Sequence, residues 1–159
     1  MSQSAAALVA RLAERLLTRG EWLASAESCT GGLLAKLCTD LPGSSGWFER
    51  GLVTYSNQAK QDLLGVDAEL IAREGAVSEV VVLAMARGLL SRAPVQHAVA
   101  ISGVAGPGGG TVAKPVGTVW VAWANAASST AQCLQLAGDR DAIRVAAAIA
   151  ALEGLWRQT

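Results

Sequence analysis

Residues 21–37 read EWLASAESCTGGLLAKL and set the pattern that the rest of the chain repeats. WLASA is a short apolar run typical of a buried strand, and the residues from about Gly31 to Thr39 are typical of a helix. Thr30 is a suitable N-cap for that helix. A strand that leads directly into a helix predicts an α/β fold. The turn between them carries three potential nucleophiles in succession, Ser28, Cys29 and Thr30.

Helix and strand patterns alternate on both sides of this segment. Leucines 8, 12 and 16 predict a helix that Gly20 ends, and Ser78 and Asp139 are suitable caps for two later helices. A short helix is expected over residues 57–65, and strands are expected at 47–56, 97–106, 117–125 and 130–138. We expect the last helix to bury Val145, Ile149, Leu152 and Trp156. The pattern predicts a three-layer α/β/α sandwich around a mostly parallel sheet with one antiparallel edge strand.

Composition limits the possible functions. The chain has 159 residues, which favours one domain, here 1–159, and 52% of them are hydrophobic. Thirteen basic residues balance thirteen acidic ones, so charge offers no reason to expect nucleic acid or an anionic membrane as a partner. The three cysteines have no metal-ligand spacing and suit a reducing, cytoplasmic compartment. The uncharged stretch 115–138 is explained by two buried strands and a turn, so we expect no membrane association.

Three loops are expected to leave the carboxyl ends of strands, where α/β sheets bind ligands. They are SCTGG (28–32), YSNQAK (55–60) and SGVAGPGGG (102–110). Ser28 lies in the first loop, where backbone N–H groups at a helix start can stabilise an oxyanion. The alternative is that Ser28 or Thr30 is only an N-cap. Cys29 is a rival nucleophile, but strand alternation points it to the opposite face.

The base that would activate a nucleophile is not evident from the residues alone. His97, the only histidine, is expected at the start of its strand, which is the wrong end of the sheet. A lysine can serve if burial or a nearby cation keeps its amine neutral. Lys60 lies in the second loop, although an exposed helix lysine would look the same. Arg140 and Arg144 can bind an anion at the start of the last helix, or Arg144 can simply pair with Asp141 on the surface.

Several long blocks together resemble the C-terminal domain of the CinA proteins. They include AESCTGGLLAKLCTDLPGSSGWFERGLVTYSNQAKQDLLGV (26–66), SGVAGPGGGTVAKPVGTVWVAWA (102–124) and GDRDAIR (138–144). The resemblance runs from about Leu8 to Trp156. It implies a mixed five-stranded sheet with a CinA-like, anticodon-binding-domain-like topology, a homodimer and no metal or other cofactor. We expect the stand-alone form of the domain.

The same resemblance implies a Ser-Lys amidohydrolase. Ser28 would be the nucleophile and Lys60 the base, with Tyr55 relaying protons or holding Lys60. The substrate-binding residues would be Thr30, Gly31, Ser45, Ser102, Gly103, Arg140 and Arg144. The family usually has Thr where this chain has Ser102, so the hydroxyl is kept but its orientation is expected to be looser. Arg144 would either bind a phosphate or lower the pKa of Lys60.

Relatives in this family include enzymes that deamidate nicotinamide mononucleotide (NMN). This deamidation is a reaction of pyridine nucleotide salvage. The resemblance therefore implies hydrolysis of NMN to nicotinate mononucleotide and ammonia. Two alternatives stay open. One is a non-catalytic nucleotide-binding or regulatory module linked to competence or DNA damage. The other is a Ser-Lys amidase that acts on a different carboxamide.

Overall fold

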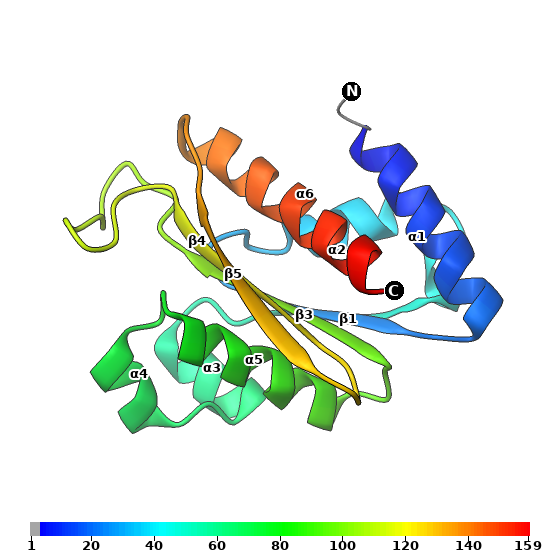
Figure 1. Ribbon diagram of the computed structural model, residues 1–159, viewed down its shortest axis with the longest axis horizontal. Helices are drawn as coiled ribbons and strands as arrows, with labels where there is room; N and C mark the ends of the chain where they lie inside the picture. The colour runs from blue at the N-terminus through cyan, green and yellow to red at the C-terminus, as the bar shows by residue number, and fades with distance from the viewer. Residues whose placement is uncertain (1–3) are drawn as a thin grey trace.

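The computed structural model describes residues 4–159, so the first three residues of the expected domain 1–159 lie outside the described residues. Helices and strands alternate through most of the chain (Figure 1). The helices are α1 (Ala5–Arg19), α2 (Leu33–Thr39), α3 (Asn57–Leu64), α4 (Ala68–Glu74), α5 (Glu79–Arg92) and α6 (Arg140–Gln158), with a 3-10 turn η1 (Ser44–Gly46). The strands are β1 (Leu23–Glu27), β2 (Phe48–Val53), β3 (His97–Gly103), β4 (Thr118–Ala124) and β5 (Ser129–Gln135).

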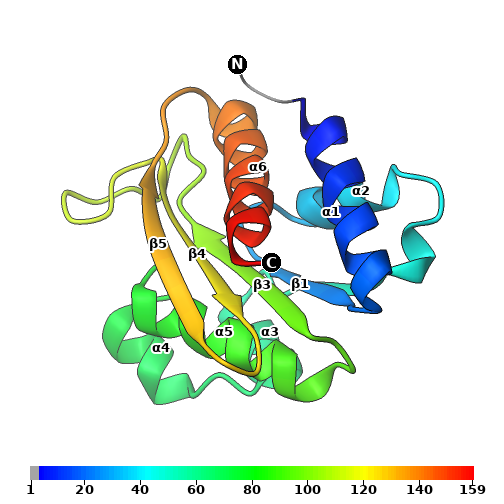
Figure 2. The same cartoon turned by 45° about the vertical axis from the view of Figure 1, so that its right-hand side comes forward.

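The expected α/β/α sandwich is confirmed. Helices α1, α2 and α6 cover one face of the sheet and α3, α4 and α5 cover the other (Figures 1 and 2). Strand alternation supplies a separate hydrophobic core to each face: Leu23 of β1 packs with α1 and α6, whereas Ala24 and Ala26 pack with α5. The strand order is β2-β1-β3-β4-β5, with β1 parallel to both β2 and β3.

The position of the antiparallel strand differs from the expectation. β4 is antiparallel to both β3 and β5 and lies inside the sheet, and the edges are β2 and β5. The reason is burial: TVWVAWA of β4 is buried along almost its whole length, whereas STAQCLQ of β5 alternates with exposed polar residues. The polar strand of the hairpin therefore takes the solvent-exposed edge.

Local caps explain most helix limits but not all. Asp139 caps α6 by accepting a hydrogen bond from the Ala142 N–H, and Gly20 ends α1 in the left-handed conformation, both as expected.

The expected buried face of α6 is partly wrong. Val145 is 42% exposed, and Ile149 and Trp156 are only partly buried, while Leu152 is buried as expected. The helix packs instead through small residues such as Ala147 and Ala151, which allow close approach to the sheet.

Helix α3 is held close to α5 by a single glycine. A Cβ atom at Gly88 of α5 would lie 2.0 Å from the carbonyl oxygen of Leu64, the last residue of α3. Only a glycine permits this approach. The packing matters for the site because α3 carries Lys60.

Candidate active site

The loops that follow β1, β2 and β3 meet at one edge of the sheet because these three strands are parallel. Backbone hydrogen bonds extend the ladder one residue beyond two of the strands. The Ser28 N–H donates to the Ile101 carbonyl at 2.9 Å, and the Thr54 N–H donates to the Glu27 carbonyl at 2.8 Å. Ser28 and the start of the 54–60 loop are therefore held in register with the sheet.

Lys60 is brought to Ser28 by α3. Ser56 caps this helix by accepting from the Ala59 N–H, and Lys60 follows one turn later on the buried face. Its Nζ atom lies 3.1 Å from the Ser28 Oγ, 2.8 Å from the Thr54 carbonyl oxygen and 3.1 Å from the Tyr55 carbonyl oxygen. Only 1% of Lys60 is exposed, compared with 9% of Ser28. The alternative of an exposed helix lysine is therefore excluded.

The surroundings of Lys60 favour a neutral amine. Burial lowers the pKa of Lys60 from its ordinary value, and no cationic side chain is among the causes of the shift. A neutral amine has two N–H donors and one lone pair. The two donors match the two carbonyl oxygens, which leaves the lone pair for the proton of Ser28. Ser28 can then transfer its proton to Lys60 as it attacks a carbonyl carbon.

A pocket of about 290 Å³ opens in front of Ser28. Lys60 does not line it, so the serine lies between the pocket and the amine. One wall is Tyr55 and Arg140, and the other is the glycine-rich loop after β3. The lining residues are Ser28, Cys29, Tyr55, Gly103, Val104, Ala105, Gly106, Gly108, Gly109 and Arg140.

Tyr55 contributes two different groups. Its carbonyl oxygen contacts Lys60, and the Ser28 hydroxyl is 3.3 Å from the same oxygen. Its phenol, in contrast, accepts a hydrogen bond from Arg140 at 3.1 Å, and the residue is 58% exposed. The backbone, rather than the expected side chain, therefore orients Lys60. Arg140 also donates to the Gly106 carbonyl at 2.7 Å, which links the two walls of the pocket.

Arg144 binds the turn that carries the nucleophile. Its Nε donates to the Cys29 carbonyl at 3.0 Å and one terminal nitrogen donates to the Thr30 carbonyl at 3.1 Å. Asp141 lies 3.8 Å from the other terminal nitrogen but is itself 90% exposed, so this ion pair is weak. Neither of the two expected roles, phosphate binding or lowering the pKa of Lys60, is needed to explain these contacts.

Four residues that were expected to bind substrate either make hydrogen bonds within the protein or lie away from the pocket. Thr30 does not cap α2: it is fully buried, and its hydroxyl donates to Glu27 at 2.7 Å. The Gly31 N–H donates to the Ser28 carbonyl at 3.0 Å, which closes the turn. The Ser102 hydroxyl donates to the Ala76 carbonyl at 2.8 Å, so its orientation is set rather than loose.

Ser45 is the fourth of these residues. It is exposed in η1, which precedes β2, and it therefore lies at the opposite end of the sheet from Ser28. Ser45 reaches no other residue of the site within this chain, because the short helix α2 returns the chain to that end. Gly103 lines the pocket as expected.

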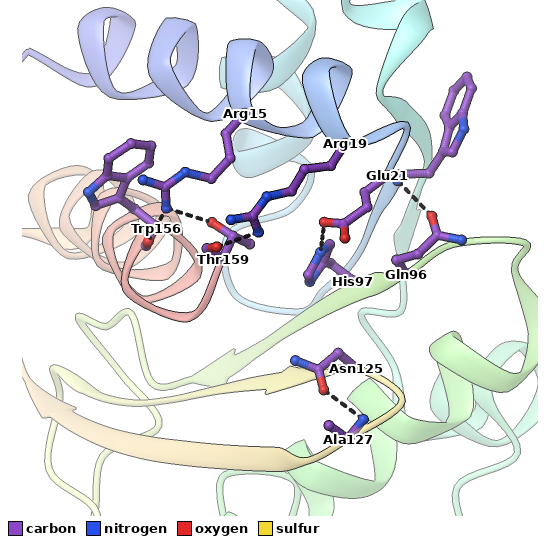
Figure 3. Close-up of polar contacts among 10 residues, drawn as sticks. Arg15, Arg19, Glu21, Gln96, His97, Asn125, Ala127, Trp156 and Thr159 are labelled. Carbon is purple, nitrogen blue, oxygen red and sulfur yellow. Dashed lines mark hydrogen bonds and ion pairs between the residues drawn. The ribbon is translucent and has the colours of Figure 1, made fainter.

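The two rival groups are excluded by their surroundings. Cys29 is among the residues that line the pocket, but it is only 6% exposed and packs into the hydrophobic core with α1, α2 and α6. Burial raises the pKa of its thiol to about 11, so little thiolate exists at neutral pH. His97 begins β3, and its Nε2 lies 2.7 Å from a Glu21 carboxylate oxygen (Figure 3). That pair lies at the start of the strands, as expected, and cannot serve Ser28.

Glu27 is a site residue that the sequence patterns above do not identify. It ends β1 next to Ser28, is 1% exposed, and accepts hydrogen bonds from the Leu34 N–H at 2.8 Å and the Ala35 N–H at 3.1 Å. It thereby takes the capping role expected of Thr30. A carboxylate that directly follows the apolar run WLASA was the available signal, because buried charges need several partners.

No group of three or more His, Cys, Asp or Glu side chains in residues 4–159 is arranged to hold a metal ion. None of the helices within that range combines the length and the apolar character that crossing a membrane requires. The cysteines Cys29, Cys38 and Cys133 are all free thiols.

The chain is similar to known proteins over nearly its whole length. The chain is 52% identical over 151 residues to the nicotinamide-nucleotide amidohydrolase PncC of Escherichia coli strain K12, covering 93% of this chain and 90% of that protein. It is 51% identical over 148 residues to the Pseudomonas putida protein of the same name, covering 93% and 92%. The crystal structure of the competence/damage inducible protein CihA from Agrobacterium tumefaciens superposes with a TM-score of 0.95 at 40% identity, covering 99% of this chain and 96% of that one.

The family assignment rests on nearly the full described length. The sequence model for the CinA C-terminal domain matches residues 5–159. A crystal structure of a CinA superfamily protein from Klebsiella pneumoniae 700603 also superposes, with a TM-score of 0.94 at 39% identity over 98% of both chains. The chain belongs to the CinA C-terminal domain family.

Proposed function

We propose that this chain is a nicotinamide-nucleotide amidohydrolase that converts NMN and water to nicotinate mononucleotide and ammonia. The observation that carries the proposal is the buried amine of Lys60 at 3.1 Å from the Ser28 hydroxyl, at the base of an open pocket. The identity of about 52% to an amidohydrolase named for nicotinamide nucleotides supports the choice of substrate.

The reaction proceeds in two halves. The neutral Lys60 amine takes the Ser28 proton as Oγ attacks the carboxamide carbon, which forms a tetrahedral oxyanion. The resulting ammonium protonates the amide nitrogen, the C–N bond breaks and ammonia leaves. Water then attacks the acyl-Ser28 ester while Lys60 accepts its proton. Collapse of the second tetrahedral species returns that proton to Ser28 and releases the carboxylate product.

The oxyanion needs hydrogen-bond donors close to Ser28. The Gly31 N–H and the Ser102 hydroxyl are already committed to the Ser28 and Ala76 carbonyls. Within residues 4–159, the Cys29 and Thr30 N–H groups donate to no backbone carbonyl. We assign the oxyanion to these two N–H groups. Gly103 and the glycine-rich loop then let the substrate approach closely from the other wall.

The phosphate of the nucleotide is assigned to Arg140. This guanidinium lines the pocket, whereas Arg144 is occupied with the Cys29 and Thr30 carbonyls. A charge-assisted contact between arginine and phosphate is strong and directional. The ring of Tyr55, held by Arg140, forms the adjacent wall and orients the substrate.

We further propose that the chain works as one domain in cytoplasmic pyridine nucleotide salvage, as a homodimer without nucleic acid. Equal numbers of basic and acidic residues give no electrostatic attraction to nucleic acid. Three unpaired thiols suit a reducing compartment.

A substrate panel tests the proposal. Purified protein is incubated with NMN, nicotinamide, nicotinamide riboside and nicotinamide adenine dinucleotide, and ammonia release is followed by a coupled assay. We expect release from NMN and none from the Ser28→Ala variant. Release from a different carboxamide alone would identify an amidase of another specificity, and no release from any compound would favour a non-catalytic binding module.

A further inference from the structure

The chain around the nucleophile is held by the buried side chain of Glu27. Oε1 accepts hydrogen bonds from the Thr30 hydroxyl at 2.7 Å and the Leu34 N–H at 2.8 Å, and Oε2 accepts from the Ala35 N–H at 3.1 Å. These donors lie three to eight residues after Glu27. The side chain therefore closes a loop over residues 27–35 that contains Ser28.

The opposite side of the same turn is held by a cation. Arg144 binds the Cys29 and Thr30 carbonyls, while the Gly31 N–H closes onto the Ser28 carbonyl. The carboxylate thus holds donors and the guanidinium holds acceptors of one short segment. Within residues 4–159, the Cys29 and Thr30 N–H groups of this segment donate to no backbone carbonyl. Ser28, whose Oγ contacts Lys60 and the Tyr55 carbonyl, lines the pocket. The proposed reaction uses the Ser28 Oγ and these two N–H groups.

We propose that Glu27 is a positioning residue that fixes the Ser28 turn and its oxyanion donors, acting through Thr30 and the first N–H groups of α2. This rests on the proposed function, because it assigns Glu27 a role in the same reaction. Glu27 does not line the pocket and none of its hydrogen bonds is to Ser28 Oγ or Lys60, so it is not a catalytic residue. A displacement of the reacting groups by about 1 Å can lower a rate by about 100-fold.

Glu27→Gln is the most direct variant. Glutamine has nearly the same shape, but its NH₂ group cannot accept a hydrogen bond. Whichever carboxylate oxygen the NH₂ group replaces, it must face a donor, either Thr30 and Leu34 at Oε1 or Ala35 at Oε2. We expect kcat with NMN to fall about 10- to 100-fold and KM to change less than about threefold, since the groups proposed to bind NMN are untouched. The acidic limb of the pH profile should keep its position, because Lys60 is unchanged. Glu49→Gln, which removes a carboxylate from β2, should behave as the unmodified protein.

Thr30 offers a matched pair. Thr30→Val keeps the volume and removes the hydroxyl that Glu27 binds, and Thr30→Ser keeps the hydroxyl. We expect a kcat loss for the valine variant, rescue by the serine variant, and a Glu27→Gln/Thr30→Val double variant no more than about twofold slower than Glu27→Gln alone. Full additivity would overturn the proposed route through Thr30.

Amide hydrogen exchange provides a readout that does not depend on turnover. Glu27→Gln should accelerate exchange in the peptide covering residues 28–36 and leave the amides of β1 protected. Normal kcat in Glu27→Gln would overturn the positioning role. A shift of the acidic limb of the pH profile would also overturn it, because that shift would indicate that the charge of Glu27 acts on Ser28 and Lys60. If the unmodified protein released no ammonia from NMN, the proposed function would fail, while the exchange result would still decide whether Glu27 fixes the turn.

Discussion

The amine of Lys60 lies 3.1 Å from the hydroxyl of Ser28, although the two residues are separated by 32 positions in the chain. The contact depends on the parallel pairing of β1 and β2, which places the residues that follow both strands at one edge of the sheet. It also depends on the close packing of α3 on α5.

Replacing Lys60 by methionine is expected to lower activity and to raise stability. Turnover of NMN should fall at least about 10³-fold, because the serine loses its base. The free energy of unfolding at pH 7 should rise, because folding lowers the pKa of Lys60 and so disfavours its ordinary charged form. Urea denaturation monitored by circular dichroism measures the second effect.

The size of that stability effect depends on pH. Below the folded-state pKa of Lys60 both states are protonated and the full destabilisation is present. Between the folded and unfolded values the unfolded chain binds more protons, so the unmodified protein gains stability as pH rises. The advantage of Lys60→Met should therefore shrink as pH approaches the ordinary lysine value of 10.5. An advantage that stayed constant with pH would contradict a lowered pKa.

The rate itself is expected to follow the same titration. Because only neutral Lys60 accepts the Ser28 proton, kcat/KM should increase with pH and level off at a value below 10.5. Steady-state kinetics between pH 5 and 10 would show this acidic limb. His97→Asn is the control: His97 is paired with Glu21 at the other end of the sheet, so the limb should not move. A limb that disappeared in this variant would identify the histidine as the base instead.

Arg140 and Arg144 are expected to differ in kinetic effect. Arg140→Met should raise KM for NMN about 10- to 100-fold with little change in kcat, because it removes a charged hydrogen-bond donor from the pocket. Arg144→Met should lower kcat, because it releases the Cys29 and Thr30 carbonyls. Initial rates over a range of NMN concentrations distinguish the two. The reverse pattern would assign the phosphate to Arg144.

Cys29 is expected to be unreactive and dispensable as a thiol. Burial raises its pKa to about 11, whereas Cys133 is exposed. Iodoacetamide at pH 8 should label Cys133 and spare Cys29 in the folded protein, as measured by peptide mass spectrometry. Cys29→Ala should keep kcat within about threefold, because its N–H and carbonyl groups remain. Loss of activity comparable to that of Ser28→Ala would make the thiol the nucleophile.

Gly88→Ala tests whether packing far from the pocket controls the position of Lys60 relative to Ser28. Its Cβ would lie 2.0 Å from the Leu64 carbonyl oxygen, so α3 must move away from α5. We expect a loss of about 1–3 kcal/mol in stability together with a lower kcat, because α3 carries Lys60. Val80→Ala on the exposed side of α5 should change stability by less than about 0.5 kcal/mol. Thermal denaturation measures the stability of both variants, and NMN kinetics measure their activity. Normal kcat in Gly88→Ala would show that the packing of α3 on α5 does not control the position of Lys60.

The elements that the sequence indicates correctly are those with a local cause. Apolar spacing, Gly20 and Asp139 predict helices from neighbours a few residues away, and the structure confirms them. Where burial depends on distant segments, the sequence misleads. Val145 fits an apolar helix stripe but faces solvent, and α4 buries Ile71 without a pattern that would predict it.

The candidate site shows the same division more sharply. The sequence by itself marked Ser28 as a hydroxyl at a strand-to-helix turn, and the family resemblance added Lys60. It did not determine that Glu27 would turn inward, that Thr30 would bind it, or that Arg144 would reach the Cys29 and Thr30 carbonyls from more than a hundred residues away. Only the tertiary structure decides these contacts, and with them the pKa of Lys60, because the exclusion of water that lowers it exists only once α3 has packed against the sheet.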